Sequence, residues 1–183
     1  MRVIAGTARS LLLKTPQGAN TRPTTDRIKE TLFNVIQTEV PGAVFADLFA
    51  GSGGIGIEAL SRGAKKAYFF ETEKEAVACI EANLKHTHMT DRSVVLKQDA
   101  VSALTYGIRE KVDVVFADPP YGQGFDEQLL RSAASSKVVT EDTLIIIEEQ
   151  KERDFSFAGA LGFEIVKEKV YKSNKHVFLR RST

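Results

Sequence analysis

The sequence is poor in cysteine, has no tryptophan and carries almost no net charge. Its single cysteine, Cys79, cannot form an internal disulfide and cannot build a cysteine-based metal site. The 25 basic and 24 acidic side chains give a formal net charge of +1, which excludes a uniformly basic nucleic-acid coat protein. No apolar run approaches the roughly 18 residues of a membrane span. The first residues show no signal-peptide pattern, so we expect a cytoplasmic protein.

The remaining composition is that of an ordinary globular chain. Of the 183 residues, 43% are hydrophobic and 27% are charged, which excludes disordered, collagen-like and disulfide-rich proteins. The length predicts one domain, residues 1–183, with a basic N-terminal hairpin extension over 1–25 and a catalytic α/β body over 26–183. His86 and His88 have no nearby carboxylate cluster of the metal-ligand type, so no metal site is expected.

From residue 43 onward, short apolar segments alternate with amphipathic helical ones. This alternation predicts βαβ units and a mostly parallel Rossmann-like sheet with helices on both faces. Residues 163–171 and 176–180 flank a polar turn and predict an antiparallel hairpin that completes the sheet. Strands are expected at 43–49, 65–71, 93–97, 112–117 and 144–148, and helices at 54–62, 73–85 and 125–134.

The first 40 residues follow a different pattern. Residues 2–5 and 11–14 could pair as a short hairpin, and apolar residues at helical spacing predict an amphipathic helix over 26–38. Thr24, Thr25 and Asp26 offer side chains that can cap this helix after Pro23.

A glycine-rich segment follows the first expected strand of the body. It contains Gly51-x-Gly53-x-x-Gly56, with a strand before it and a helix after it. Glycines let a ligand approach the backbone, and the helix N-terminus offers free N–H groups. Glu71 ends the next strand 20 residues after Gly51, where a carboxylate can accept hydrogen bonds from both ribose hydroxyls. The segment therefore predicts a nucleoside cofactor site.

The acidic residues around this loop favour one cofactor. A carboxylate at Asp47 can pair with a ligand ammonium and would repel a pyrophosphate, which favours S-adenosylmethionine over a dinucleotide. Asp99 can accept from an adenine amine or cap a helix over 100–106, and the two roles are compatible. Glu73 is an alternative to Glu71 as the ribose ligand. The expected cofactor-binding residues are Asp47, Phe49, Gly51, Ser52, Gly53, Gly56, Glu71, Asp99 and Ala100.

Asp118-Pro119-Pro120-Tyr121 follows the fourth expected strand of the body. Two prolines fix the backbone and remove two N–H donors, so the turn presents mainly the Asp118 carboxylate and the Pro119 carbonyl. Two acceptors suit a substrate that brings two N–H groups, such as the exocyclic amine of a purine. Holding both hydrogens directs the nitrogen lone pair at an electrophilic methyl group, and Asp118 stabilises the developing positive charge. Tyr121 offers a ring on which a flipped base can stack.

These motifs resemble the class I S-adenosylmethionine-dependent methyltransferases. Residues 4–6 (Ile-Ala-Gly), 21–27 (Thr-Arg-Pro-Thr-Thr-Asp-Arg) and the Glu30-x-x-Phe33-Asn34 block resemble the RsmD family of bacterial 16S rRNA guanine-N2 methyltransferases. The resemblance implies a seven-stranded fold, S-adenosylmethionine as methyl donor, and 16S rRNA or a partly assembled small ribosomal subunit as partner of a monomeric enzyme. It also implies that residues 22–27 border the cofactor and RNA site. The RNA contacts it suggests are Arg9, Arg22, Thr24 and Arg27.

Three alternatives remain on the sequence alone. An adenine-N6 DNA methyltransferase uses the same Asp-Pro-Pro-Tyr chemistry, but the catalytic sheet consumes nearly all the residues and leaves no region to read DNA sequence. A Rossmann oxidoreductase gives Asp47 and the 118–121 turn no role. A non-catalytic RNA-binding module has no need of intact acceptor groups in that turn.

The small net charge conceals two basic ends around an acidic body. Residues 1–27 carry five basic side chains and one acidic one, and residues 165–183 carry six and one. Basic residues next to the site are where phosphate attraction is useful. The sequence leaves it open whether the C-terminal hairpin touches RNA.

Overall fold

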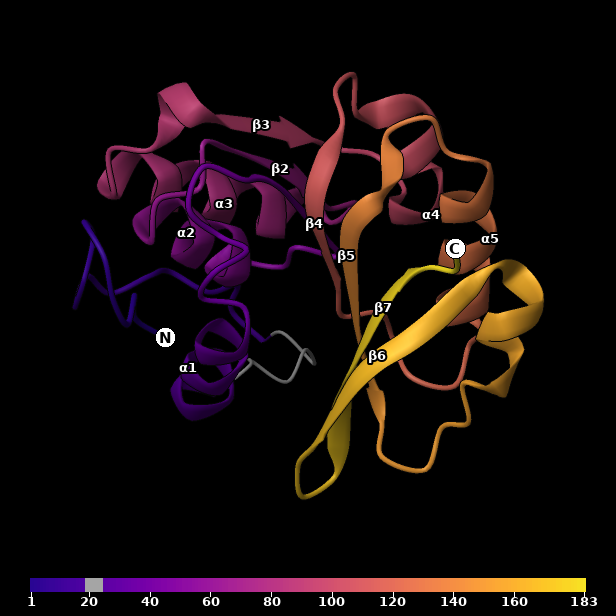
Figure 1. Cartoon of the computed structure of the whole chain (residues 1–183). Coiled ribbons are helices and arrows are strands. Elements are labelled where there is room, and N and C mark those ends of the chain that lie inside the picture. The colour runs from indigo at the N-terminus through magenta and orange to yellow at the C-terminus, as the bar shows by residue number, and fades with distance from the viewer. Residues whose placement is uncertain (19–24) are drawn as a thin grey trace.

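A computed structural model of the chain describes residues 1–18 and 25–183, and its centre is one seven-stranded sheet (Figure 1). The strand order is β3-β2-β1-β4-β5-β7-β6. Strands β1 to β5 are parallel to their neighbours among one another, whereas β7 lies between β5 and β6 and is antiparallel to both. The mostly parallel sheet with a C-terminal antiparallel hairpin is thus confirmed. The strands are β1 (Val44–Leu48), β2 (Lys66–Phe70), β3 (Ser93–Leu96), β4 (Val112–Ala117), β5 (Val139–Gln150), β6 (Phe163–Val170) and β7 (Asn174–Arg181).

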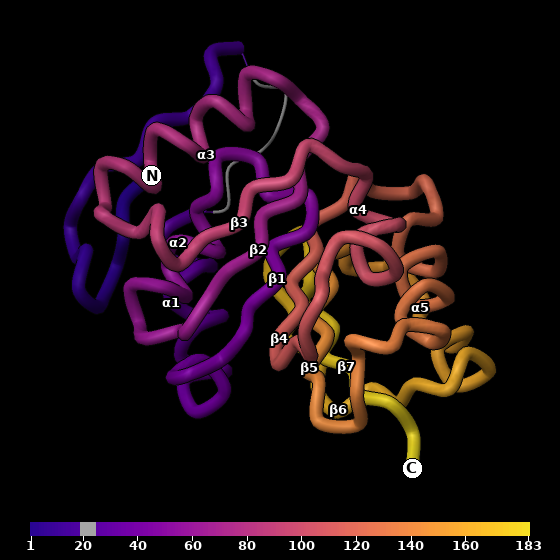
Figure 2. The backbone as a smooth tube through the Cα atoms, turned by 90° about the horizontal axis from the view of Figure 1, so that it is seen from above, coloured from indigo at the N-terminus to yellow at the C-terminus, as the bar shows by residue number. Residues whose placement is uncertain are grey.

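Helices cover both faces of the sheet, as the alternating pattern predicts. In Figures 1 and 2, α1, α2 and α3 lie on one side of the strands, and α4 and α5 lie on the other. None of the helices in the described ranges is long and apolar enough to cross a membrane. The helices are α1 (Asp26–Val35), α2 (Gly54–Ser61), α3 (Lys74–His86), α4 (Ala100–Ser102) and α5 (Phe125–Ser135), with short 3-10 turns at Thr90–Arg92 and Ser156–Leu161 and a π-helical turn at Ala103–Gly107.

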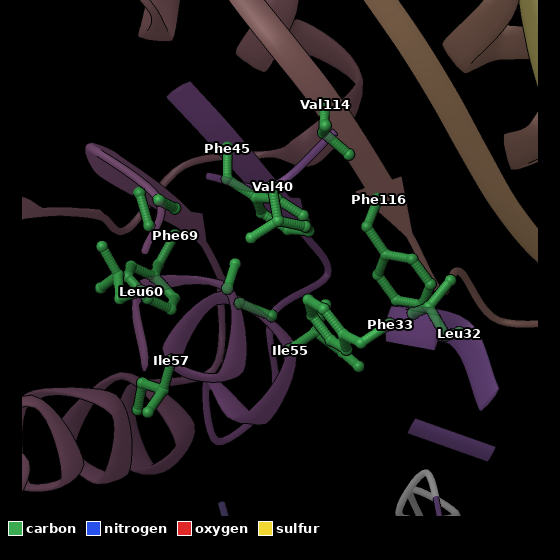
Figure 3. Packing of buried hydrophobic residues seen from close by; sticks show 14 of the residues in the cluster. Leu32, Phe33, Val40, Phe45, Ile55, Ile57, Leu60, Phe69, Val114 and Phe116 are labelled. Atoms are coloured by element: carbon green, nitrogen blue, oxygen red, sulfur yellow. The ribbon is translucent and has the colours of Figure 1, made fainter. Parts of the chain in front are cut away.

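The central strands are buried on both faces, which explains their continuous apolar sequences. Successive side chains of a strand point to opposite faces, so β1 contributes Phe45 to one core and Val44 and Ala46 to the other. Figure 3 shows the first core, where Phe33 of α1 and Phe116 of β4 gather with the side chains of α2. The two cores fix the sheet between its helical layers, and so fix the edge where the strands end.

The N-terminal segment forms the expected hairpin only in a minimal form. Arg2 and Leu12 make an antiparallel bridge, flanked by hydrogen bonds from the Val3 N–H to the Leu11 carbonyl and from the Leu13 N–H to the Met1 carbonyl, at 3.0 Å each. The backbone between the paired segments packs on α2: the Ala8 N–H donates to the Ser61 hydroxyl at 3.0 Å, and a Cβ at Gly6 would lie 1.8 Å from the Ser61 carbonyl oxygen. Close contact with α2 therefore accompanies a very short pairing.

Some element bounds also differ from the predicted ones. The first helix ends at Val35 rather than at residue 38, and the expected helix over 100–106 is one turn of α4 followed by the π-helical turn. β5 begins at Val139, five residues before its apolar run. Val139 pairs with Val112, and the Thr143 hydroxyl donates to the Val112 carbonyl at 2.7 Å. These contacts make the polar residues between Val139 and Leu144 part of the strand.

Candidate active site

The carboxyl ends of four parallel strands bring the predicted motifs to one edge of the sheet. Leu48 at the end of β1 pairs with Phe70 of β2 and with Ala117 of β4, and Ala117 pairs with Ile147 of β5. The residues that follow these positions therefore lie side by side along the same edge of the sheet. Open α/β sheets bind ligands at this edge.

The glycine loop turns sharply between β1 and α2. Its backbone adopts positive φ at Phe49 (59°), Gly51 (56°) and Gly53 (84°), and Gly53 is the N-cap of α2. For Phe49 this conformation is uncommon, and its ring packs edge-on against Phe125 with 5.3 Å between centroids. The loop thus takes a shape that glycines at 51 and 53 allow, with Ser52 buried between them.

Glu71 is directly bonded to the glycine loop. One carboxylate oxygen accepts from the Gly51 N–H at 2.8 Å, and the other accepts from the N–H groups of Thr72 and Glu73 at 2.9 and 3.0 Å. Glu73, the alternative ribose ligand, is exposed and makes no capping hydrogen bond at the start of α3. Glu71 is therefore the acidic side chain that the structure places against the loop.

Asp47 lies beneath the first turn of α2. Its carboxylate accepts from the Gly56 N–H at 2.9 Å, and only 2% of the residue is exposed. Burial raises the pKa of Asp47 to about 8, and the charge of Glu71 adds to the effect, although the hydrogen bond from Gly56 opposes it. A side chain at position 56 would meet the Phe69 ring at 2.4 Å, so Gly56 lets α2 approach β2.

Asp99 performs the capping role that its sequence position allows. Its carboxylate accepts from the Ser102 N–H at 2.9 Å at the start of α4, whose first residue, Ala100, is buried. The Asp99 side chain is exposed, and its predicted contact with adenine remains a prediction.

The Asp118-Pro119-Pro120-Tyr121 turn leaves the end of β4. Pro119 is buried and Pro120 is exposed, while Asp118 is half-buried. Burial raises the pKa of Asp118 well above its ordinary value, and the charges of Glu148, Asp47 and Glu149 raise it further. The turn therefore holds a carboxyl group with an unusually strong affinity for protons.

A buried polar network supports this turn from β5 and β7, and the sequence interpretation missed it. Glu148 accepts hydrogen bonds from the Tyr121 hydroxyl at 3.1 Å and the Asn174 amide at 2.8 Å, and its other oxygen lies 2.9 Å from His176 Nε2. His176 Nδ1 is 3.1 Å from the Tyr171 hydroxyl. Burial acts to raise the pKa of Glu148, but these partners hold it below its ordinary value. The signal in the sequence is a carboxylate at the end of an apolar strand, as at Asp47 and Glu71.

Asn83 is a second residue that the sequence interpretation missed. It is buried on α3, and its amide donates to the Ser52 carbonyl and to the Lys14 carbonyl at 2.9 Å each. Its carbonyl accepts from the Lys14 N–H at 2.8 Å. A polar residue three positions after Ile80, on the apolar face of the helix, is the pattern that could have revealed it. Asn83 ties the glycine loop to the N-terminal segment.

The expected RNA-binding residues are not all brought to this edge. Arg22 and Thr24 lie outside the described residues. Arg27 is exposed on α1, and Asp26 pairs with Arg2 at 3.5 Å rather than with Arg27. Arg9 is exposed beside the last turn of α2, about 12 Å along the helix from the glycine loop. The contribution of these residues to RNA binding remains a prediction.

The charges at the edge fit a cationic cofactor. Among residues 1–18 and 25–183, no ion pair involves Asp47, Glu71, Asp99 or Asp118. Four carboxyl groups without basic partners, next to a helix N-terminus and an aromatic ring, suit a ligand with a sulfonium and an ammonium group. In the same described ranges, no group of three or more metal-ligating side chains is found.

Comparison with known proteins places the chain in a family. Residues 1–180 match the family described as Conserved hypothetical protein 95. The Bacillus subtilis protein YlbH is 38% identical over 154 residues, which cover 83% of this chain and 84% of YlbH. Ribosomal RNA small subunit methyltransferase D of Haemophilus influenzae is 34% identical over 155 residues, or 84% of this chain and 80% of the relative.

A solved structure extends the likeness over the whole fold. The Escherichia coli protein yhhF matches with a TM-score of 0.84 at 30% identity, covering 100% of this chain and 98% of yhhF. The chain therefore belongs to the RsmD family of class I S-adenosylmethionine-dependent methyltransferases.

Proposed function

We propose that this protein methylates the exocyclic N2 amine of a guanine in 16S ribosomal RNA, as a monomer in the cytoplasm. The observation that carries the proposal is the position of Asp118 and the Pro119 carbonyl, at the same sheet edge as the acidic cofactor site. The name of the Haemophilus influenzae relative supports small-subunit ribosomal RNA as the substrate.

Different residues of the cofactor site would contact different parts of S-adenosylmethionine. When bound, S-adenosylmethionine supplies an electrophilic methyl group. Asp47 and the glycine loop would face its amino-acid end, Glu71 its ribose and Asp99 its adenine, with Phe49 beside them. To accept ribose hydroxyls, Glu71 must share or release the N–H groups that it now bonds.

The catalytic turn would hold the amine by its two hydrogens. The Asp118 carboxylate and the Pro119 carbonyl each accept one N–H, which aims the nitrogen lone pair toward the methyl group. As the C–N bond forms, the nitrogen becomes positive and the nearby carboxylate stabilises it. Because its pKa is raised, Asp118 is also a good acceptor for the proton that the methylated amine then loses.

Tyr121 completes the turn as a surface for the flipped base. Its hydroxyl donates to Glu148, so its ring is held from β5 rather than by the loop alone. Stacking on an aromatic ring contributes about 1–3 kcal/mol per base and does not depend on base identity. The acceptors of the turn therefore select an amine, and Tyr121 adds binding energy.

The test is methyl transfer from labelled S-adenosylmethionine to 16S rRNA and to small subunits isolated from cells that lack this protein. We expect N2-methylguanosine at one position, identified by nuclease digestion and mass spectrometry. The matched control is the Asp118→Ala protein. N6-methyladenine in DNA would establish the alternative enzyme, and RNA binding without transfer would establish the non-catalytic module.

A further inference from the structure

The hairpin of β6 and β7 carries a row of basic side chains beyond the cofactor site. We propose that Lys167, Lys169 and Lys172 bind phosphates of the substrate RNA and hold the strand beside the catalytic turn. The proposal rests on the proposed function and names a second contact area for the same substrate. In Figure 1 the tip of this hairpin projects from the lower end of the molecule.

The lysines are exposed because β6 is the edge strand of the sheet. All of its residues after Phe163 are exposed. Lys167 and Lys169 are two positions apart and lie on one face of the strand. Lys172 follows in the turn, which the Tyr171 N–H closes by donating to the Asn174 carbonyl at 2.8 Å.

The positive charges on this face are not neutralised within the protein. Glu168, which lies between the two strand lysines, points to the opposite face and pairs with Lys175 at 3.0 Å. No ion pair in residues 1–18 and 25–183 involves Lys167, Lys169 or Lys172. Three unpaired ammonium groups on an exposed face complement a polyanion.

The register of the sheet places this face level with the catalytic turn. Ala117 pairs with Ile147, so Asp118 lies in the row of Glu148. Glu148 pairs with His176, and His176 pairs with Lys169. Asp118 and Lys169 are thus separated by three strand spacings, about 14 Å. An RNA strand whose target base enters the catalytic turn can reach the hairpin within a few nucleotides.

The residues between Asp118 and Lys169 in this row of the sheet also hold the hairpin in place. His176, between Glu148 and Lys169, is fully buried and packs against Phe116 of β4 with 5.7 Å between ring centroids. Lys167 and Lys169 therefore lie on a strand that is paired with a buried part of the sheet, and Lys172 follows them in the turn. Phosphate contacts made there fix the position of the strand relative to Asp118.

The experiment compares two triple variants with equal loss of charge. Lys167→Ala, Lys169→Ala and Lys172→Ala remove the proposed contacts. The control removes three other exposed lysines, Lys65, Lys111 and Lys137, which precede β2, β4 and β5 at the opposite edge of the sheet. Both variants are first checked for an unchanged melting temperature and an unchanged Kd for S-adenosylmethionine.

We expect the hairpin variant to bind a 16S rRNA fragment at least tenfold more weakly, while the control stays within about twofold. For the hairpin variant, the slope of log Kd against log salt concentration should decrease in magnitude by about two, because three phosphate contacts are lost. KM for RNA should rise with kcat nearly unchanged. Equal RNA affinities of the two variants would overturn the hairpin proposal. Absence of RNA methylation by the unaltered protein would instead overturn the proposed function.

Discussion

The buried carboxylate of Asp47 is joined to the backbone N–H of Gly56 by a hydrogen bond of 2.9 Å at the start of α2. This contact links the strand end to the helix N-terminus within the proposed cofactor site. One hydrogen bond does not repay the burial of a carboxylate, and the pKa of Asp47 rises from 3.8 to about 8. In the free protein, the proposed cofactor site therefore disfavours the charged form of the Asp47 carboxyl.

This cost predicts a stability effect with a defined sign. A carboxyl whose pKa is raised on folding contributes stability below its unfolded pKa and loses that contribution as pH rises through its folded pKa. Asp47→Asn keeps an acceptor for Gly56 and cannot ionise. We expect the stability of the variant, relative to that of the unaltered protein, to rise between pH 5 and pH 9 by about 4 kcal/mol, with most of the rise completed near pH 8.

Urea unfolding of the free proteins at both pH values measures this difference, with Asp91→Asn, an exposed carboxyl, as control. A difference that does not change with pH would contradict the assigned cause. The same substitution should weaken the binding of S-adenosylmethionine, because the site loses a negative charge that faces a cation.

Glu71 and Glu73 provide a second pair of predictions. Glu71→Ala should weaken S-adenosylmethionine binding about tenfold or more, because the ribose loses its acceptor and Gly51 loses its hydrogen bond. Glu73→Ala is the matched control and should have little effect, since Glu73 is exposed. Calorimetric titration of both variants decides between them. The opposite ranking would identify Glu73 as the ribose ligand.

The sequence predicted those parts of the candidate site that lie in single strand–turn units. The glycine loop, Glu71 and the 118–121 turn each depend on local chemistry at a strand end, and the topology then brings them together. Residues that act between distant segments could not be found in this way. Lys29 appears in the sequence as a polar position of a surface helix, yet it is fully buried beside Glu58, with 3.6 Å between the charged groups.

The Lys29–Glu58 pair exists because the N-terminal segment covers it. Glu58 accepts from the N–H groups of Ile4 and Ala5, and the Lys29 ammonium donates to the Arg2 carbonyl. Nothing in the local pattern of α1 or α2 indicates this partner. The role of His176 could not be predicted for the same reason, because its partner Glu148 is 28 residues away on another strand.

Asp118→Asn should separate catalysis from cofactor binding. The amide occupies the same space but carries no charge to stabilise the developing ammonium and cannot take its proton. We expect kcat to fall by a factor of about 10² to 10⁴, while the Kd for S-adenosylmethionine changes by less than about threefold. Single-turnover kinetics with saturating RNA tests this directly. Turnover near that of the unaltered protein would remove Asp118 from the chemical step.

Glu148 should set the pH range of the reaction through Asp118. Its negative charge raises the pKa of Asp118, together with burial and the charges of Asp47 and Glu149. Glu148→Gln keeps one oxygen as acceptor for Tyr121 and Asn174, presents an amide NH2 group to His176 Nε2, and removes the charge. The pKa of Asp118 should then fall, so the acidic limb of the kcat–pH profile should move to lower pH.

The profile distinguishes this electrostatic role from a merely structural one. If Glu148 only supported the turn, Glu148→Gln would lower kcat equally at every pH and leave the acidic limb in place. Glu152→Gln, an exposed residue just after β5, is the control and should leave both the rate and the profile unchanged. His176→Phe tests the same network from β7: it removes the partner that lowers the pKa of Glu148, so Glu148 should protonate more readily and the acidic limb should again move to lower pH.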